Sequence, residues 1–212
     1  MIYEVRTYNL LPHSVPEFEK RFGEAYEKRK NYSPLAAFWH TEIGPLNQII
    51  HVWPYKDVAE RDRIRAAAVK DGVWPPKTSE FIVAQQSDIM VPFPISPELK
   101  PGNVGPYFEI RTYTYGAGEL PKIMKLWEKA MPARLALSPV TAIWYSDIGS
   151  LSKFVHIWPY KSMEERNEVR KKGVETGVWP PSALAKREGL PTYRLLSQEN
   201  KIVMPSSFSP LQ

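Results

Sequence analysis

The hexapeptide His51-Val52-Trp53-Pro54-Tyr55-Lys56 constrains this chain most, because it returns 105 residues later as His156-Ile157-Trp158-Pro159-Tyr160-Lys161. Residues 4–8 and 72–76 return at the same offset, as 109–113 and 177–181. Compared without gaps over residues 4–76, 29 of 73 positions are identical to their partners. Solenoid repeats run about 20–50 residues, so a period of this length is that of a small domain. The chain therefore consists of two copies of one domain-sized unit.

The duplication predicts the domain boundaries. We expect a first domain over residues 1–97, a proline-rich linker over 98–106 and a second domain over 107–212. Copies of about a hundred residues are long enough to bury a core. After Pro181 the second copy carries several extra residues around Lys186–Gly189, and the register between the copies is lost only there.

Composition limits the classes of protein to which the chain belongs. With 43% hydrophobic and 24% charged residues, it has the balance of a globular protein, and no membrane span is expected. The net charge of +5 comes from interleaved basic and acidic residues, which argues against a nucleic-acid-binding surface. There is no cysteine, and so no disulfide or thiolate chemistry. Since the chain starts directly with a strand pattern rather than a signal peptide, we expect a cytoplasmic location.

Periodicity predicts the elements of the first copy. Residues 2–8 read as a strand, and Ser14 is placed to cap an amphipathic helix with a capping box. Residues 36–43 and 49–53 read as two further strands joined by a turn at 44–48. Pro54 cannot donate to a sheet and should end the third strand, after which Asp57, or Ser162 in the copy, caps a second helix. The last strand is predicted over residues 81–91, and in the copy near 202–204.

This order of elements is typical of an α+β, ferredoxin-like unit in which helices cover one face of an antiparallel sheet. The other face must be covered, and the second copy can do this. We therefore predict tandem ferredoxin-like repeats packed as a pseudo-twofold α+β barrel with its helices outside. On the first strand Glu4, Arg6 and Tyr8 share a face. We expect this polar face to line the lumen of the barrel.

The strand Glu4–Tyr8, the segment Trp39–Gly44, the His-hydrophobic-Trp strand and the later Trp-Pro pair together resemble the NIPSNAP family. Both copies carry the resemblance, which covers nearly the whole chain. It implies the dimeric α+β barrel superfamily, whose members include cofactor-independent monooxygenases, haem-degrading enzymes, isomerases and binding proteins. The family supplies no agreed catalytic residues. Catalytic residues, and whether the chain is an enzyme, therefore stay open.

Two pairs of residue types are candidates for a site in each copy. Glu4 and Arg6 either orient a polar substrate and transfer protons or simply neutralise each other in the interior. His51 next to Trp53 is either a general base or haem ligand, or a core histidine whose ring nitrogens are satisfied by neighbours. Trp74 forms either an aromatic rim that contacts a ligand or a static plug.

The candidate ligand-binding residues are thus six side chains and their copies, namely Glu4, Arg6, Tyr8, His51, Trp53, Trp74, Glu109, Arg111, Tyr113, His156, Trp158 and Trp179. Four histidines without cysteines or a dense carboxylate cluster give no metal signature, and no cofactor is expected.

Three functional hypotheses follow. The first is a small-molecule-binding protein whose ligand lies in the barrel lumen. The second is an interaction or scaffold module without catalysis, and the third is a monooxygenase-, isomerase- or haem-handling-type enzyme. The expected partner is a small-molecule ligand, and a homo-oligomer of the two-domain chain is compatible with the sequence.

Overall fold

The structure is a computed structural model that describes residues 1–191 and 193–212. Its elements are, in chain order, β1 (Ile2–Leu10), α1 (Val15–Arg29), β2 (Ala37–Ile43), β3 (Gln48–Tyr55), α2 (Val58–Lys70), η1 (Ser79–Phe81), β4 (Ile82–Pro92), β5 (Tyr107–Tyr115), α3 (Leu120–Leu135), β6 (Ala142–Ile148), β7 (Lys153–Tyr160), α4 (Met163–Glu175), α5 (Pro181–Arg187) and β8 (Leu195–Pro205). The second half repeats the first and adds α5 where the register between the copies is lost.

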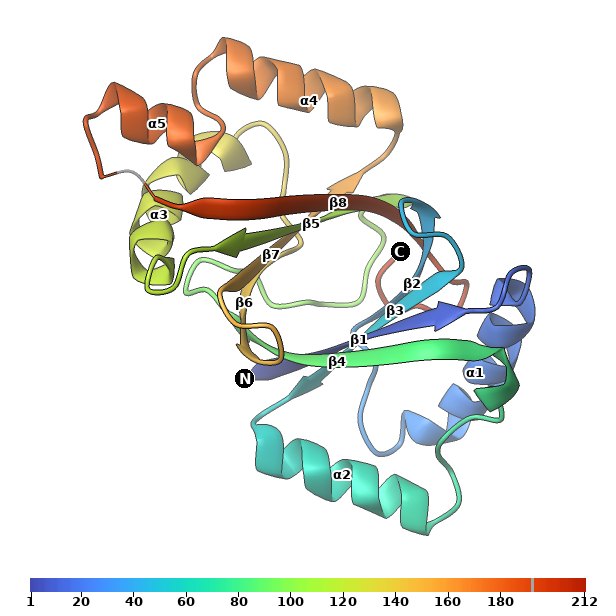
Figure 1. The fold of residues 1–212 in the computed structure, drawn as a ribbon. Helices are drawn as coiled ribbons and strands as arrows, with labels where there is room; N and C mark the ends of the chain where they lie inside the picture. Colours follow the sequence, from blue (N-terminus) through green and yellow to red (C-terminus); the bar gives the residue numbers. More distant parts are fainter. Residues whose placement is uncertain (192) are drawn as a thin grey trace.

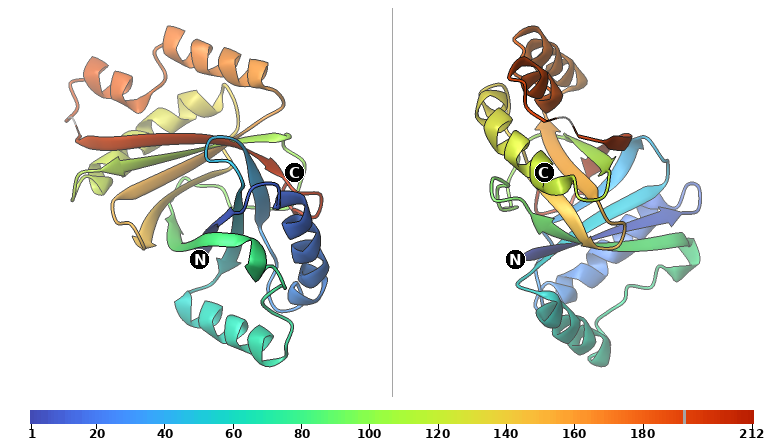
Figure 2. Two further views of the ribbon diagram at one scale, coloured as in Figure 1. Left: turned by 45° about the vertical axis from the view of Figure 1, so that its right-hand side comes forward. Right: turned by 60° about the vertical axis from the view of Figure 1, so that its left-hand side comes forward.

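The strands form one closed barrel in the order β1-β3-β2-β8-β5-β7-β6-β4. All neighbouring strands are antiparallel. The helices lie outside, α1 and α2 against the first half and α3, α4 and α5 against the second (Figures 1 and 2). The predicted α+β barrel of tandem repeats is confirmed. Because each strand has two neighbours, the barrel leaves no open sheet edge.

The two halves complete each other. The last strand of each half pairs with the other half, β4 with β6 and β8 with β2. Past the strand ends, the backbone N–H of Phe93 donates to the carbonyl of Ile143 at 2.9 Å, and that of Ser206 to the carbonyl of Phe38 at 3.1 Å. The interface between the halves is therefore continuous sheet and core.

Pro54 and Ser14 differ from the sequence-based expectation, whereas Asp57 agrees with it. Pro54 lies inside β3 rather than after it. Past Val52, β3 pairs only with β1, so Pro54 needs no donor toward β2. Asp57 caps α2 as predicted, accepting from the N–H of Glu60 at 2.8 Å. Ser14 does not cap α1 with its side chain, because its hydroxyl donates to the carbonyl of Leu11 at 2.6 Å.

One end of the barrel is filled by core. Tyr3 stacks on Trp144 with ring centroids 4.7 Å apart, and its hydroxyl accepts from the N–H of Leu99 at 3.1 Å. The linker then runs parallel to the C-terminus through a bridge between Gly102 and Leu211. Together these groups close the end of the barrel at which β1 and β5 begin.

Candidate functional site

A cavity of about 360 Å³ occupies the lumen between the two halves. Aliphatic side chains and two indoles line it together with a set of polar groups: Val5, Thr7, Trp39, Pro45, Gln48, Ile50, Val52, Gln86, Asp88, Met90, Ile110, Thr112, Thr114, Trp144, Ser150, Lys153, Val155, Ile157, Glu199 and Lys201. Gln86 and Glu199 are exposed, so the polar end reaches solvent where β1 and β5 finish. The cavity is thus amphipathic, with its polar groups toward the mouth.

Strand alternation decides which side chains reach the lumen. Val5 and Thr7 point inward from β1, and residues two apart on a strand share a face. On the neighbouring strand β4, Asp88 pairs with Val5 and Gln86 with Thr7. β8 repeats this arrangement beside β5, where Lys201 stands opposite Ile110 and Glu199 opposite Thr112.

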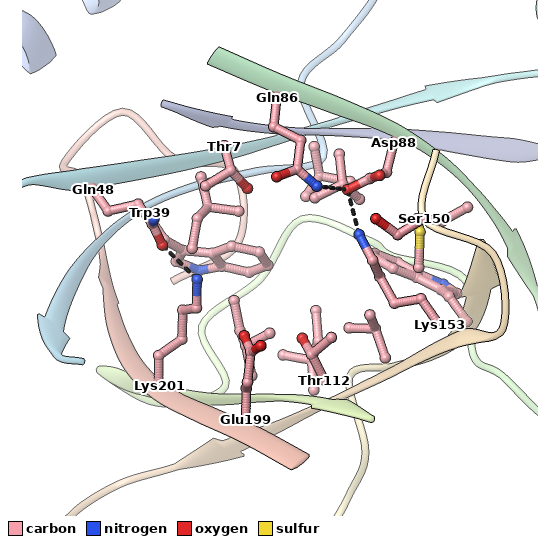
Figure 3. Close-up of a pocket in the computed structure, with 18 of the residues that line it drawn as sticks. Thr7, Trp39, Gln48, Gln86, Asp88, Thr112, Ser150, Lys153, Glu199 and Lys201 are labelled. Carbon is pink, nitrogen blue, oxygen red and sulfur yellow. Dashed lines mark hydrogen bonds and ion pairs between the residues drawn. The ribbon is translucent and has the colours of Figure 1, made fainter. Parts of the chain in front are cut away.

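One wall of the cavity carries a complete ion pair. Lys153 donates to Asp88 Oδ2 at 2.8 Å, and Gln86 Nε2 donates to the same oxygen at 2.8 Å (Figure 3). Gly149 leaves the space for this carboxylate, because a Cβ atom there would lie 2.2 Å from Asp88 Oδ1. An anion is therefore held here by an ammonium and an amide.

The opposite wall has different side chains at the positions that the internal repeat relates to Asp88 and Lys153. Lys201 takes the place of Asp88, and Gln48 that of Lys153. Lys201 donates to Gln48 Oε1, while Gln48 Nε2 donates to Asn9 at 2.8 Å and so fixes the orientation of the amide. In the described chain Lys201 has no carboxylate within ion-pairing distance. Burial lowers the pKa of Lys201, nearby Glu199 opposes the shift, and Lys153 adds to it.

Both lumen indoles have an unpartnered donor. Trp39 and Trp144 are fully buried, yet their Nε1–H groups have no hydrogen-bond partner within the described chain. Most buried polar groups in folded proteins are hydrogen-bonded, and leaving one unpaired costs about 1–3 kcal/mol. Both indoles line the cavity, so two donors beside it have no acceptor in the described chain.

The expectation that Glu4, Arg6, Tyr8 and His51 line the lumen is wrong, as it is for their copies Glu109, Arg111, Tyr113 and His156. The lumen is lined by the other face of β1 and β5. The face with these groups lies under the helices, where α2 and α4 supply their charge partners. Polarity alone could not distinguish the faces, since both are amphipathic.

Under the helices, Glu4 lies in a cluster of arginines. Its fully buried carboxylate accepts from Arg6 at 2.8 Å and from Arg61 of α2 at 2.6 Å, and Arg65 approaches to 3.6 Å. Burial opposes ionisation, but these arginines lower the pKa of Glu4 to about 2. Glu109 repeats the arrangement with Arg111 at 3.0 Å, Arg166 at 2.6 Å and Arg170 at 3.8 Å. The mutual-neutralisation interpretation therefore fits these pairs.

The repeated histidines are core residues, but only one ring nitrogen of each is satisfied as expected, because neither Nε2 atom has a hydrogen-bond partner in the described chain. His51 Nδ1 accepts from Trp53 Nε1 at 2.7 Å, and in the copy Trp158 donates to His156 at 2.5 Å. Burial lowers the pKa of both histidines well below the ordinary value, and nearby arginines add to the effect. Their rings pack against aromatic neighbours, at 5.1 Å for His51 and Phe22. Both are thus neutral groups on the face of the sheet opposite the lumen, since their strand neighbours line the cavity.

The tryptophans of the two Trp-Pro segments differ in their surroundings. Trp74 packs edge-on against Phe22 at 5.1 Å. Trp179 and Tyr113 line a second cavity of about 510 Å³ between β5, α3 and the added helix α5. Trp179 and Tyr113 are thus two of the twelve candidates that lie on a cavity. That any of the twelve binds a ligand stays a prediction.

Sequence reasoning missed the lumen groups. The candidates are identical in both copies, whereas Gln48 and Lys153 differ. Asp88 and Lys201 also differ, and they align only when the extra residues before β8 are set aside so that Val91-Pro92 matches Met204-Pro205. The available signal was that these polar positions differ between the two copies.

In residues 1–191 and 193–212, three or more histidine, cysteine or acidic side chains nowhere gather as a metal-binding group. Over the same residues, each helix is too short or too polar to cross a membrane.

Comparison with known proteins gives the family. A family model described as NIPSNAP matches residues 3–97 and again 108–210. A protein NipSnap homolog of Dictyostelium discoideum is 30% identical over 208 residues, covering 96% of this chain and 87% of the relative. The human protein NipSnap homolog 3A is 29% identical over 219 residues, covering 100% of this chain and 86% of the relative.

Among solved structures, a putative monooxygenase from Lactobacillus acidophilus is similar with a TM-score of 0.62. The match covers 96% of this chain and 92% of the other, at 12% sequence identity. A likeness at this identity concerns the fold alone.

Proposed function

The chain belongs to the NIPSNAP family by both of its halves, and on that premise we propose that it binds a small molecule in the lumen of its barrel, apolar end first. The main support is the amphipathic cavity, which is lined by two indoles whose buried Nε1–H groups have no hydrogen-bond partner in the described chain. Ligand sites are typically concave and mostly apolar with a few fixed polar groups, and this cavity has that composition. Its closed end would take the apolar body, and its mouth would hold a polar head.

Native mass spectrometry of freshly purified protein tests this proposal. We expect a bound small molecule to add its mass to that of the chain, and we call this addition the retained mass. A matched pair of variants then locates the ligand. Thr112→Trp places an indole in the lumen, while Ser182→Trp places one in the second cavity under α5. We expect Thr112→Trp to remove the retained mass and Ser182→Trp to keep it. The reverse result would place the ligand in the second cavity and contradict the proposal.

One observation favours an interaction module as a second candidate. Exposed aliphatic side chains stand on the hairpin β2–β3 and on its copy β6–β7, namely Ile43, Leu46, Ile148 and Leu151. Exposed apolar groups that recur at the same place in both halves are candidates for a contact surface, one on each hairpin. If no small molecule is retained and Leu46→Lys with Leu151→Lys abolishes co-purification of a protein partner, this second function would be supported instead.

The enzymatic alternatives draw less support from the geometry. Haem ligation by His51 or His156 would require a ring nitrogen open to a cavity, and both rings are packed among aromatic side chains.

A cytoplasmic location also stays a proposal. Fractionation of cells that produce the untagged protein would test the location.

A further inference from the structure

The two walls of the lumen are related by the internal repeat, and only one of them carries an ion pair in the described chain. On the first wall the carboxylate of Asp88 receives Lys153 Nζ and Gln86 Nε2, each at 2.8 Å. On the second wall Lys201 stands where Asp88 would be, so a donor replaces the acceptor. The internal carboxylate of the first wall therefore has no counterpart on the second.

Donors converge on this second wall. Figure 3 shows Trp39, Gln48 and Lys201 on the same side of the cavity, opposite Asp88 and Lys153. Trp39 Nε1–H is buried and unpartnered, and Lys201 uses the oxygen of Gln48 as its only side-chain acceptor in the described chain. An ammonium has three donors and an indole has one, and neither can accept from the other in its ordinary state. The missing partner must be an acceptor.

We infer that the ligand of the lumen carries a carboxylate, which binds Lys201 Nζ and Trp39 Nε1 and places an aliphatic body against the apolar wall. This inference rests on the proposed function and names its ligand class. The Asp88 pair is the template within the same molecule, because there the lumen holds a carboxylate with an ammonium and a neutral N–H donor. Charge-assisted hydrogen bonds of this kind are the strong ones.

Glu199 carries a negative charge close to the proposed position of the ligand carboxylate. It lies two residues before Lys201 on the same face of β8, is exposed at the mouth, and forms no ion pair with Lys201 in the described chain. It would repel a ligand carboxylate weakly from the solvent side. Its neutral counterpart in the other half is Gln86, which helps to hold Asp88.

Calorimetric titration with octanoate and 1-octanol tests the inference, because the probes share a chain and differ in the charge of the head. The folded chain with both halves should bind octanoate about tenfold or more tightly than octanol, the size of a charge-assisted contact. Lys201→Met should remove this preference and keep octanol binding. Lys122→Met, the same change on the exposed surface of α3, should leave the preference intact.

Two further variants sharpen the result. Trp39→Phe keeps a ring and removes the N–H, so the preference should fall several-fold while octanol still binds. Glu199→Gln should strengthen octanoate binding. Equal binding of both probes, or a preference unchanged in Lys201→Met, overturns the carboxylate inference and leaves lumen binding standing. If neither probe binds, the inference falls, and a purified chain without a retained mass then removes the proposed function with it.

Discussion

The charges under the helices are the same in the two halves, whereas the charges in the lumen differ between them. Glu4 and Glu109 have the same three arginine partners at matching positions. In the lumen, Asp88 corresponds to Lys201, a charge of opposite sign. Each half must pack its own helices onto its own strands, so the same buried charges are needed twice. Both halves contribute to one lumen, so its two walls do not need the same side chains.

The largest effect on stability is expected when the two halves are separated. We expect residues 1–97 and 107–212, produced separately, to lack a stable monomeric fold, because each loses the strand that the other half supplies to β2 or β6. Exposed strand edges and an uncovered sheet face should cause self-association. Sedimentation and chemical denaturation would measure this. A cooperative monomer of either piece at low concentration would contradict the expectation.

Truncating the repeated core indoles comes next. Trp53→Ala and Trp158→Ala should each lower the free energy of unfolding by about 3–5 kcal/mol, as large core aromatics do. Both side chains are 2% exposed, and Arg29 and Arg134 lie over their rings at 4.8 and 4.0 Å. Denaturant midpoints should show similar losses in the two variants. A loss below about 1 kcal/mol in one alone would show that the halves are not equivalent here.

A smaller loss is expected when one buried carboxylate is neutralised. Glu4→Gln should cost about 3 kcal/mol at neutral pH, because several arginines lose their anion. The pKa of Glu4 falls from its ordinary 4.5 to about 2 in the folded state, so its stabilisation is present above pH 4.5 and disappears as the pH falls toward 2.

Denaturation of Glu4→Gln between pH 7 and pH 2 checks this sign. The difference in unfolding free energy from the unmodified protein should shrink through that window and vanish near its lower end. Glu109→Gln is the matched variant, and its loss at neutral pH should be of similar size since its partners lie at similar distances. A difference that stays constant with pH would remove ionisation of Glu4 as the cause.

The sequence predicted the barrel well and the facing of its strands poorly. The internal repeat and the periods of two and 3.6 residues gave the element order, and the Asp57 cap followed from one residue type. The inward face of β1 could not be chosen, because Tyr3-Val5-Thr7 and Glu4-Arg6-Tyr8 are each partly apolar. The choice depends on Arg61 and Arg65, which meet Glu4 only after α2 has packed onto the sheet. Their identity with Arg166 and Arg170, one turn apart on the copied helix, was the available signal.

The smallest effect on stability should come from making the two walls of the lumen alike. In the double variant Gln48→Lys with Lys201→Asp, the second wall would carry the same carboxylate and ammonium as Asp88 and Lys153. Gln48 and Lys201 already touch, so the new pair has the required reach. The free energy of unfolding should change by less than about 1 kcal/mol, because the attraction within a largely buried ion pair is roughly offset by the cost of removing its two charges from water.

Lys201→Asp alone is the control for this double variant, since it places a carboxylate beside the Gln48 oxygen and near Glu199 without a cation. It should be less stable than the double variant, by about 1–2 kcal/mol in a thermodynamic cycle measured by denaturation. The double variant should also lose its preference for octanoate over octanol, because the new aspartate would fill the place of the ligand carboxylate. A stable double variant that keeps the preference would show that the difference between the two walls does not determine ligand charge.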